Sequence, residues 1–376
     1  MRPLVLQRPA RWPAITSAAR GPALTARIGR LLGIAFGICF VTGLLSHYQY
    51  APWHWLPIPA APYWGYRLTQ GLHVITGLSC IPLLLIKLWS VFHRLLVWPP
   101  VRSAGHALER GSVAILVASS AFQLFTGLLN ILQWYPWPWG FVAVHYWMSW
   151  VVVGSLLLHI AVQLPAIRDG LSQRVWHAPD STALSRRSVL IAGGTGVALV
   201  TATTIGQVIP ALQPIGLLAP RQPRNGPLGV PVNRTAQAAN VIQQAASPQY
   251  RLTVHGPRLI VLTRQQLEAQ PTVRTILPIA CVEGWSIQAH WRGIRLLDLV
   301  RQVGGDGSSR VTVHSLERGS AYSSSSLTGS QLAQAVLATH LNGSRLSLDH
   351  GYPVRLIAPD RAGVLQTKWL TRIEVR

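Results

Sequence analysis

The sequence predicts an all-α bundle of five membrane helices followed by an extracytoplasmic α+β domain. Five apolar runs approach or exceed the roughly 20 residues that a helix needs to cross a bilayer. A segment rich in Pro and Gly follows the last run, and beyond it short β-rich runs alternate with helical pieces. The composition agrees, because 49% of the 376 residues are hydrophobic and only 12% are charged.

The apolar runs divide the chain into predicted regions. The runs cover about 31–47, 67–91, 111–132, 141–164 and 189–210. We expect a cytoplasmic basic N-terminus at 1–30, four membrane helices within 31–164, a cytoplasmic loop at 165–188, a fifth helix at 189–210, a linker at 211–233 and the α+β domain at 234–376. We interpret the first run as a retained helix and not as a signal peptide, because four more runs follow it.

The net charge of +22 comes almost entirely from arginine. Its distribution excludes nucleic acid as the expected partner, because the arginines cluster beside the apolar runs, at 1–30, 94–110 and 168–187. Short basic loops beside membrane helices mark the cytoplasmic side, whereas the loops 48–66 and 133–140 contain no Lys or Arg. With five spans, the region after residue 210 is therefore expected outside a bacterial cytoplasmic membrane, with lipid around the helices.

Two arginines, Arg186 and Arg187, directly precede the fifth apolar run. The segment S-R-R-S-V-L-I-A-G-G is similar to a twin-arginine export signal. Export of this kind moves folded domains, which agrees with a cofactor inserted in the cytoplasm. The alternative is that the pair only adds positive charge to an inner loop.

The α+β domain is predicted from runs of β-branched and aromatic residues. Strands are expected at 250–254, 276–280, 311–315 and 354–358, and helices at 294–300 and 330–338. About 140 residues are enough for one hydrophobic core.

Cys281 lies in this domain, in the stretch P-I-A-C-V-E-G-W-S, and is the only cysteine after residue 80. It therefore has no partner for a disulfide within its own domain. C-V-E-G-W-S and the following W-R-G-I-R-L-L-D-L-V resemble the cofactor-binding segment of the sulfite oxidase family of molybdenum enzymes, which includes periplasmic methionine-sulfoxide reductases. A second, longer match is L-D-H-G-Y-P-V-R-L-I-A-P-D-R-A-G-V-L-Q-T-K-W-L-T-R-I-E-V. The resemblance covers roughly 230–376.

The resemblance implies a molybdenum–molybdopterin cofactor with Cys281 as the metal ligand. A soft thiolate suits this metal, and the metal keeps it deprotonated. The alternative for Cys281 is an ordinary buried thiol. The resemblance further implies that the pterin is bound by Asn233, Ser315, His350, Arg355, Gln366, Thr367 and Lys368, and that the substrate pocket contains Tyr322 and Arg234. For Arg355 the alternation of an apolar strand leaves the solvent face as an alternative.

The predicted membrane helices contain His73, His145 and His159. Residues 145 and 159 are 14 positions apart, which is nearly four helical turns and ~21 Å, so they share one face. This spacing resembles the haem-binding helix of membrane cytochrome b subunits. We expect one haem b between His73 and His145, and a second at His159 only with a further ligand. His47 is an alternative to His73, and the histidines are alternatively polar links between helices.

Together these features predict a membrane-anchored, molybdopterin-dependent oxidoreductase. Its outer domain would carry out oxygen-atom or two-electron transfer on a small molecule. The bundle would exchange the electrons with a quinone or a redox partner protein. The alternatives are a non-enzymatic membrane anchor or assembly protein that retains the fold, and a haem-only quinone cytochrome.

Overall fold

The computed structural model describes residues 21–50, 59–95, 101–132, 134–173, 186–206, 209–217, 225–320 and 322–376. Several predictions fall outside these ranges. They concern the arginines of 1–20, much of the outer loop 48–66, and the residues 174–185 that lead into the Arg186–Arg187 pair.

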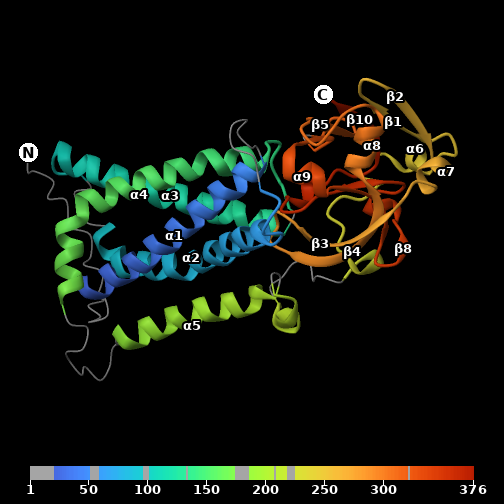
Figure 1. The fold of residues 1–376 in the computed structure, drawn as a ribbon. Coiled ribbons are helices and arrows are strands. Elements are labelled where there is room, and N and C mark those ends of the chain that lie inside the picture. The colour runs from blue at the N-terminus through green and yellow to red at the C-terminus, as the bar shows by residue number, and fades with distance from the viewer. Residues whose placement is uncertain are drawn as a thin grey trace, which may run out of the picture. The chain divides into compact units, whose positions relative to one another are not determined.

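The N-terminal part of the chain forms five long helices (Figure 1). They are α1 (Pro22–Tyr50), α2 (Gly65–Leu95), α3 (Ala104–Ile131), α4 (Phe141–Ser172) and α5 (Arg186–Ile205). All five are long and apolar enough to cross a membrane, which confirms the predicted set of apolar helices. Helix α1 begins nine residues before its apolar run, at Pro22. A proline is tolerated as the first helical residue, because an N–H there would have no intrahelical partner.

The chain folds as two compact units whose boundary passes through the helices. One unit comprises Met1–Gly37, Gly77–Phe125 and Trp147–Leu199. The other comprises Ile38–Thr76, Thr126–Tyr146 and Val200–Arg376. The first unit is held by apolar side chains from neighbouring helices, including Leu32, Phe36, Cys80, Leu83 and Val152. The second unit contains the whole α+β domain together with the first three turns of α2.

Two β-sheets form the α+β domain (Figure 1). One sheet has the order β2-β1-β10-β5-β6, and β1 and β10 pair in parallel. The other has the order β3-β4-β7-β8, and β9 pairs with β7. The strands are β1 (Arg251–His255), β2 (Leu259–Thr263), β3 (Val273–Ala280), β4 (Ser286–Arg295), β5 (Val311–Ser315), β6 (Ser324–Leu327), β7 (Val336–Leu341), β8 (Ser344–Arg345), β9 (Arg355–Ile357) and β10 (Leu370–Val375).

Short helices connect these strands: α6 (Ile242–Ala246), α7 (Arg264–Glu268), α8 (Leu296–Gln302) and α9 (Gly329–Gln334). The four predicted strands and the helix near 294–300 are confirmed as β1, β3, β5, β9 and α8. The helix predicted over 330–338 is wrong in its second half, because α9 ends at Gln334 and Val336 begins β7. Hydrogen bonding of Val336–Ala338 to both β4 and β9 outweighs the helical pattern there.

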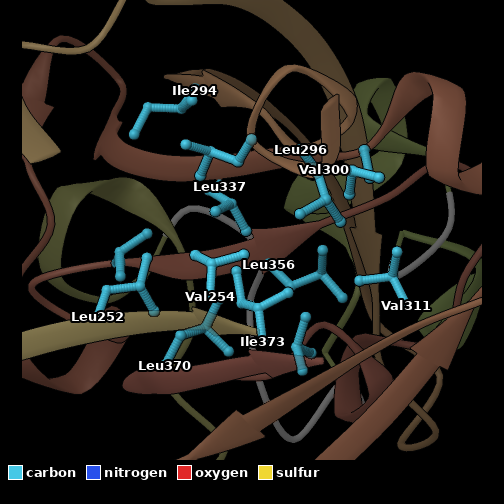
Figure 2. Close-up of a cluster of buried hydrophobic side chains, with 14 of the residues drawn as sticks. Leu252, Val254, Ile294, Leu296, Val300, Val311, Leu337, Leu356, Leu370 and Ile373 are labelled. Atoms are coloured by element: carbon cyan, nitrogen blue, oxygen red, sulfur yellow. The ribbon is translucent and has the colours of Figure 1, made fainter. Parts of the chain in front are cut away.

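The main core of the domain lies between the two sheets. Leu252 and Val254 alternate on β1, so both face inward, and Leu370 and Ile373 join them from β10 (Figure 2). The opposite side is supplied by Ile294, Leu296, Val300, Leu337 and Leu356. Complete burial of each such side chain contributes about 1.5–3 kcal/mol, so this core fixes where the strand ends lie.

Candidate functional site

Cys281 lies in the tight turn between β3 and β4. The Cys281 N–H donates to the carbonyl of Trp285 (2.9 Å), and the Gly284 N–H donates to the carbonyl of Cys281 (3.1 Å). Gly284 has φ = 101°, which only glycine adopts without strain. The Trp285 indole donates to the Glu283 carboxylate (3.0 Å). The turn therefore holds the buried thiol in one position.

A small pocket surrounds this thiol. Residues from both sequence motifs and from the predicted linker contribute to it. Its lining consists of Pro231, Asn233, Ile279, Cys281, Trp285, His350, Arg355, Gly363 and Lys368. The Asn233 amide lies 3.9 Å from the Cys281 sulfur. The structure thus brings together five of the predicted site residues.

Arg355 provides a buried positive charge in this pocket. Its guanidinium donates to the carbonyls of His350 (3.1 Å) and Gln366 (3.0 Å), and burial lowers its pKa to about 9. The solvent-face alternative is wrong, because all three residues of β9 are buried. Among the described residues, Arg355 has no ion-pair partner, and its Nε has no hydrogen-bond partner. A buried cation in this state is stabilised by an anionic ligand.

Lys368 adds to the positive character of the pocket, and His350 lies in the same lining. The Lys368 ammonium donates to the carbonyls of Asp349 (2.8 Å) and Arg234 (2.9 Å), and burial and Arg355 lower its pKa to about 7. Burial and Arg355 also lower the pKa of His350, to about 4, so this imidazole is neutral at pH 7. Its Nε2 lies 3.1 Å from the carbonyl of Val230. The cations repel one another unless a negative charge lies between them.

Three further predicted residues hold the pocket wall and do not line it. Ser315 donates to the carbonyl of Lys368 (2.8 Å), and the hydroxyls of Thr367 and Ser325 lie 2.8 Å apart. The Gln366 amide donates to the carbonyl of Arg361 (3.3 Å). Its carbonyl oxygen is buried without a hydrogen-bond partner in the described part of the chain, which leaves one acceptor for a ligand.

The two residues predicted for the substrate pocket lie outside this lining. Arg234 forms an ion pair with Glu317 (3.0 Å), and 52% of its side chain is exposed. Tyr322 is partly buried, which raises the pKa of its phenol. Its ring meets that of Tyr50 edge-on, with 5.6 Å between ring centroids.

Several residues in or behind the pocket lining escaped the sequence-based prediction. Pro231 lines the pocket, and Val230 is fully buried and packs with Cys281, yet both fell within the predicted linker 211–233. Gly363 gives no signal in the sequence, but a Cβ there would lie 2.9 Å from the carbonyl oxygen of Ala280. Trp285 was part of the quoted motif and could have been singled out as the aromatic residue beside the thiol.

The helices bring His73 and His145 together. Their ring centroids are 6.1 Å apart and their planes are inclined at 73°. His73 Nδ1 lies 2.8 Å from the carbonyl of Cys39, so it donates there and leaves Nε2 as the acceptor nitrogen. His47 instead stacks on Tyr146, with 3.8 Å between centroids.

His159 lies in the other compact unit. The charged groups acting on it are those of Lys87 and Glu109. The Glu109 carboxylate accepts a hydrogen bond from Gln163 (2.6 Å). No second histidine is paired with His159 among the ring contacts of the described residues. The structure therefore separates the three predicted histidines into one pair and one single residue.

Comparison with known proteins gives consistent matches for the C-terminal part. The family model described as "Oxidoreductase molybdopterin binding domain" matches residues 238–376. Mitochondrial sulfite oxidase of Mus musculus is 35% identical over 96 residues, which are 23% of this chain and 18% of that protein. The nitrate reductase [NAD(P)H] of Hordeum vulgare is 36% identical over 96 residues, 23% of this chain and 11% of that one.

Among solved structures, the sulfane dehydrogenase SoxCD from Paracoccus pantotrophus matches 34% of this chain and 38% of its own, with 22% identity and a TM-score of 0.31. The chain spans less than a fifth of the length of the two curated relatives named above.

Proposed function

Because residues 238–376 form a molybdopterin-binding domain of the sulfite oxidase type, we propose that the chain is a membrane-anchored molybdenum oxidoreductase. The observation that carries this proposal is the meeting of the Cys281 thiol with the buried cation of Arg355 in one pocket. The domain would act on a small molecule, and the helices would exchange the electrons.

The pocket residues fit a molybdenum–molybdopterin cofactor. Cys281 would hold the metal, and the side chains of Arg355 and Lys368 would neutralise the anionic groups of the pterin. The unpartnered Nε of Arg355 and Oε1 of Gln366 are a buried donor and a buried acceptor that such a ligand would satisfy. When bound, the cofactor supplies oxygen-atom transfer and two-electron redox chemistry.

The chain's own residues would bind and orient the substrate. The phenol of Tyr322 is protonated at neutral pH, as an ordinary tyrosine is, and burial raises its pKa further, so it can donate a hydrogen bond to an oxyanion. Arg234 would attract an anionic substrate, although Glu317 compensates part of its charge. Trp285 and Ile279 cover one side of the Cys281 thiol and keep water from it.

The membrane part is proposed to carry one haem b between His73 and His145. The 6.1 Å between the two ring centroids would allow both imidazoles to hold one haem, which would supply one-electron transfer. The hydrogen bond from Nδ1 to the carbonyl of Cys39 fixes the His73 tautomer, and Nε2, which lies 4.0 Å from the Cys39 sulfur, would be the nitrogen that binds a metal. Glycines lie beside both rings, and a Cβ at Gly43 would lie 2.9 Å from His73.

We further propose that the five helices lie in a bacterial cytoplasmic membrane with the C-terminal domain outside. The support is the set of five apolar helices and the arginine clusters beside them. Export would use the twin-arginine pair, and a quinone or a redox partner protein would exchange electrons with the haem.

The test is the metal and haem content of the full chain purified in detergent. We expect molybdenum close to one per chain by mass spectrometry and a low-spin haem b absorption spectrum. Protein with neither would instead support an anchor or assembly role. Haem without molybdenum would support a haem-only cytochrome.

A further inference from the structure

Three residues on one face of the first turns of α2 contact other parts of the chain. Tyr66, Gln70 and His73 are spaced at i, i+4 and i+7, which places them on the same side of the helix. All three belong to the compact unit that contains the molybdopterin domain.

Two of these residues contact the chain on either side of Cys281. The buried ring of Tyr66 packs in a cluster with Ala280 and Ala362. The Gln70 amide donates a hydrogen bond of 2.7 Å to the carbonyl of Val282. The residue before Cys281 and the residue after it are therefore both in contact with α2.

Asp360 fixes the beginning of the same helix. Its buried carboxylate accepts hydrogen bonds from the backbone N–H of Tyr66 and from the Gln49 amide (3.0 Å). A carboxylate at a helix N-terminus satisfies an N–H that lacks an intrahelical partner and interacts favourably with the helix dipole. Asp360 also lies on the segment that leads to Gly363 of the pocket, so one anchor orients both α2 and the pocket wall.

We propose that this face of α2 is a docking surface that couples the Cys281 turn to His73, and that Gln70 is its positioning residue. The proposal rests on the proposed function, because it assumes a metal on Cys281 and a haem on His73. One connection runs along the backbone from Cys281 to Val282, across the Gln70 hydrogen bond, and over one helical turn to His73.

The coupled reaction would be a one-electron exchange between a molybdenum held by Cys281 and a haem held by His73, in which one group is oxidised as the other is reduced and no bond of the chain is made or broken. Two such exchanges balance a two-electron reaction of the substrate. The positions 70 and 73 are separated by about 4.5 Å along the helix axis, at about 1.5 Å per residue.

Intramolecular electron transfer can be measured without a known substrate. A laser flash with a flavin donor reduces the haem of the purified full chain, and the haem absorption band then reports how fast the electron leaves. We expect Gln70→Leu, which keeps side-chain volume but removes the hydrogen bond, to slow this step at least tenfold. Gln70→Asn, which is too short to reach Val282, should behave alike.

Tyr63→Phe is the matched control, because it removes a different hydrogen bond of the same unit, from Tyr63 to Gln334 (2.8 Å). It should leave the rate within twofold of the wild type. Unchanged rates in both Gln70 variants would overturn the proposal. A slow rate in Tyr50→Leu alone would assign the route to the Tyr50–Tyr322 contact instead.

A second readout does not depend on redox activity. Hydrogen–deuterium exchange of the full chain should become faster in the peptide covering 278–286 when Gln70 is replaced by Leu, and should not change there in Tyr63→Phe. Equal exchange in all three proteins would exclude docking through Gln70. Wild-type protein without haem would refute the proposed function, whereas the exchange result would still decide the docking contact.

Discussion

The pocket around Cys281 and the histidine pair of α2 and α4 are built in different ways. The pocket draws its residues from segments more than 130 positions apart, and the sheets bring them together. The pair needs only two rings on two helices and one hydrogen bond to a backbone carbonyl. Because the two sites share no side chain, a substitution that abolishes ligand binding at one site should leave binding at the other intact.

The largest effect is expected at the thiol. Cys281→Ser replaces the only sulfur ligand of the pocket with a weaker, harder oxygen donor, so molybdenum should fall to the background of the measurement. The haem spectrum should not change. Retention of molybdenum at the wild-type level would show that Cys281 is a buried structural cysteine.

Loss of the haem should likewise leave the molybdenum site intact. His73→Ala and His145→Ala each remove one imidazole that would hold the haem, so the haem band should be lost while molybdenum is retained. His159→Ala is the control on the same helix, and it should keep the haem, because His159 lies in the other compact unit. Loss of haem in His159→Ala alone would move the haem away from the pair.

The C-terminal domain should also depend on an export signal that the membrane helices before it do not need. We expect the change of both Arg186 and Arg187 to Lys to leave the C-terminal domain inside, since it keeps the loop charge but removes the twin-arginine pattern. Protease accessibility of the domain in spheroplasts measures this. The same change at Arg102 and Arg110 is the control, and an outside domain in both variants would reduce Arg186 and Arg187 to topology signals.

A smaller contrast is expected between two arginines of the domain. Arg355→Gln removes a buried donor of charged hydrogen bonds worth about 1.5–3 kcal/mol, so retention of molybdenum during purification should fall at least tenfold. Arg234→Gln breaks a half-exposed ion pair, and such pairs contribute about 0–1 kcal/mol. Its molybdenum content should remain within about fivefold of the wild type. Equal losses would contradict the assignment of Arg355 to the pocket.

Sequence patterns predict those parts of the molecule whose signal is local. The five helices follow from long, mainly apolar runs, and β1 from the alternation around Leu252 and Val254. The motif around Cys281 predicted the centre of the pocket. The end of α9 at Gln334 could not be predicted in this way, because it depends on pairing of β7 with strands far along the chain.

The site itself shows the same limit. Val230 and Pro231 lie in a segment whose composition is that of a linker, and only the folded domain reveals that Pro231 lines the pocket and that Val230 packs with Cys281. The pairing of His73 with His145, and not with His47, depends on how the helices pack within their unit. Helical spacing placed His145 and His159 on one face but gave no partner to His159.

Arg355 and Lys368 place two positive charges in one pocket, and these charges repel each other until an anion binds there. Burial lowers the pKa of both groups, and the charge of Arg355 lowers that of Lys368 further. A ligand that binds only the folded domain stabilises it by about 2.7 kcal/mol at a concentration of 100 Kd. An anionic cofactor would therefore stabilise the folded state of its own domain. The thermal stability of the domain would then distinguish cofactor-loaded protein from empty protein.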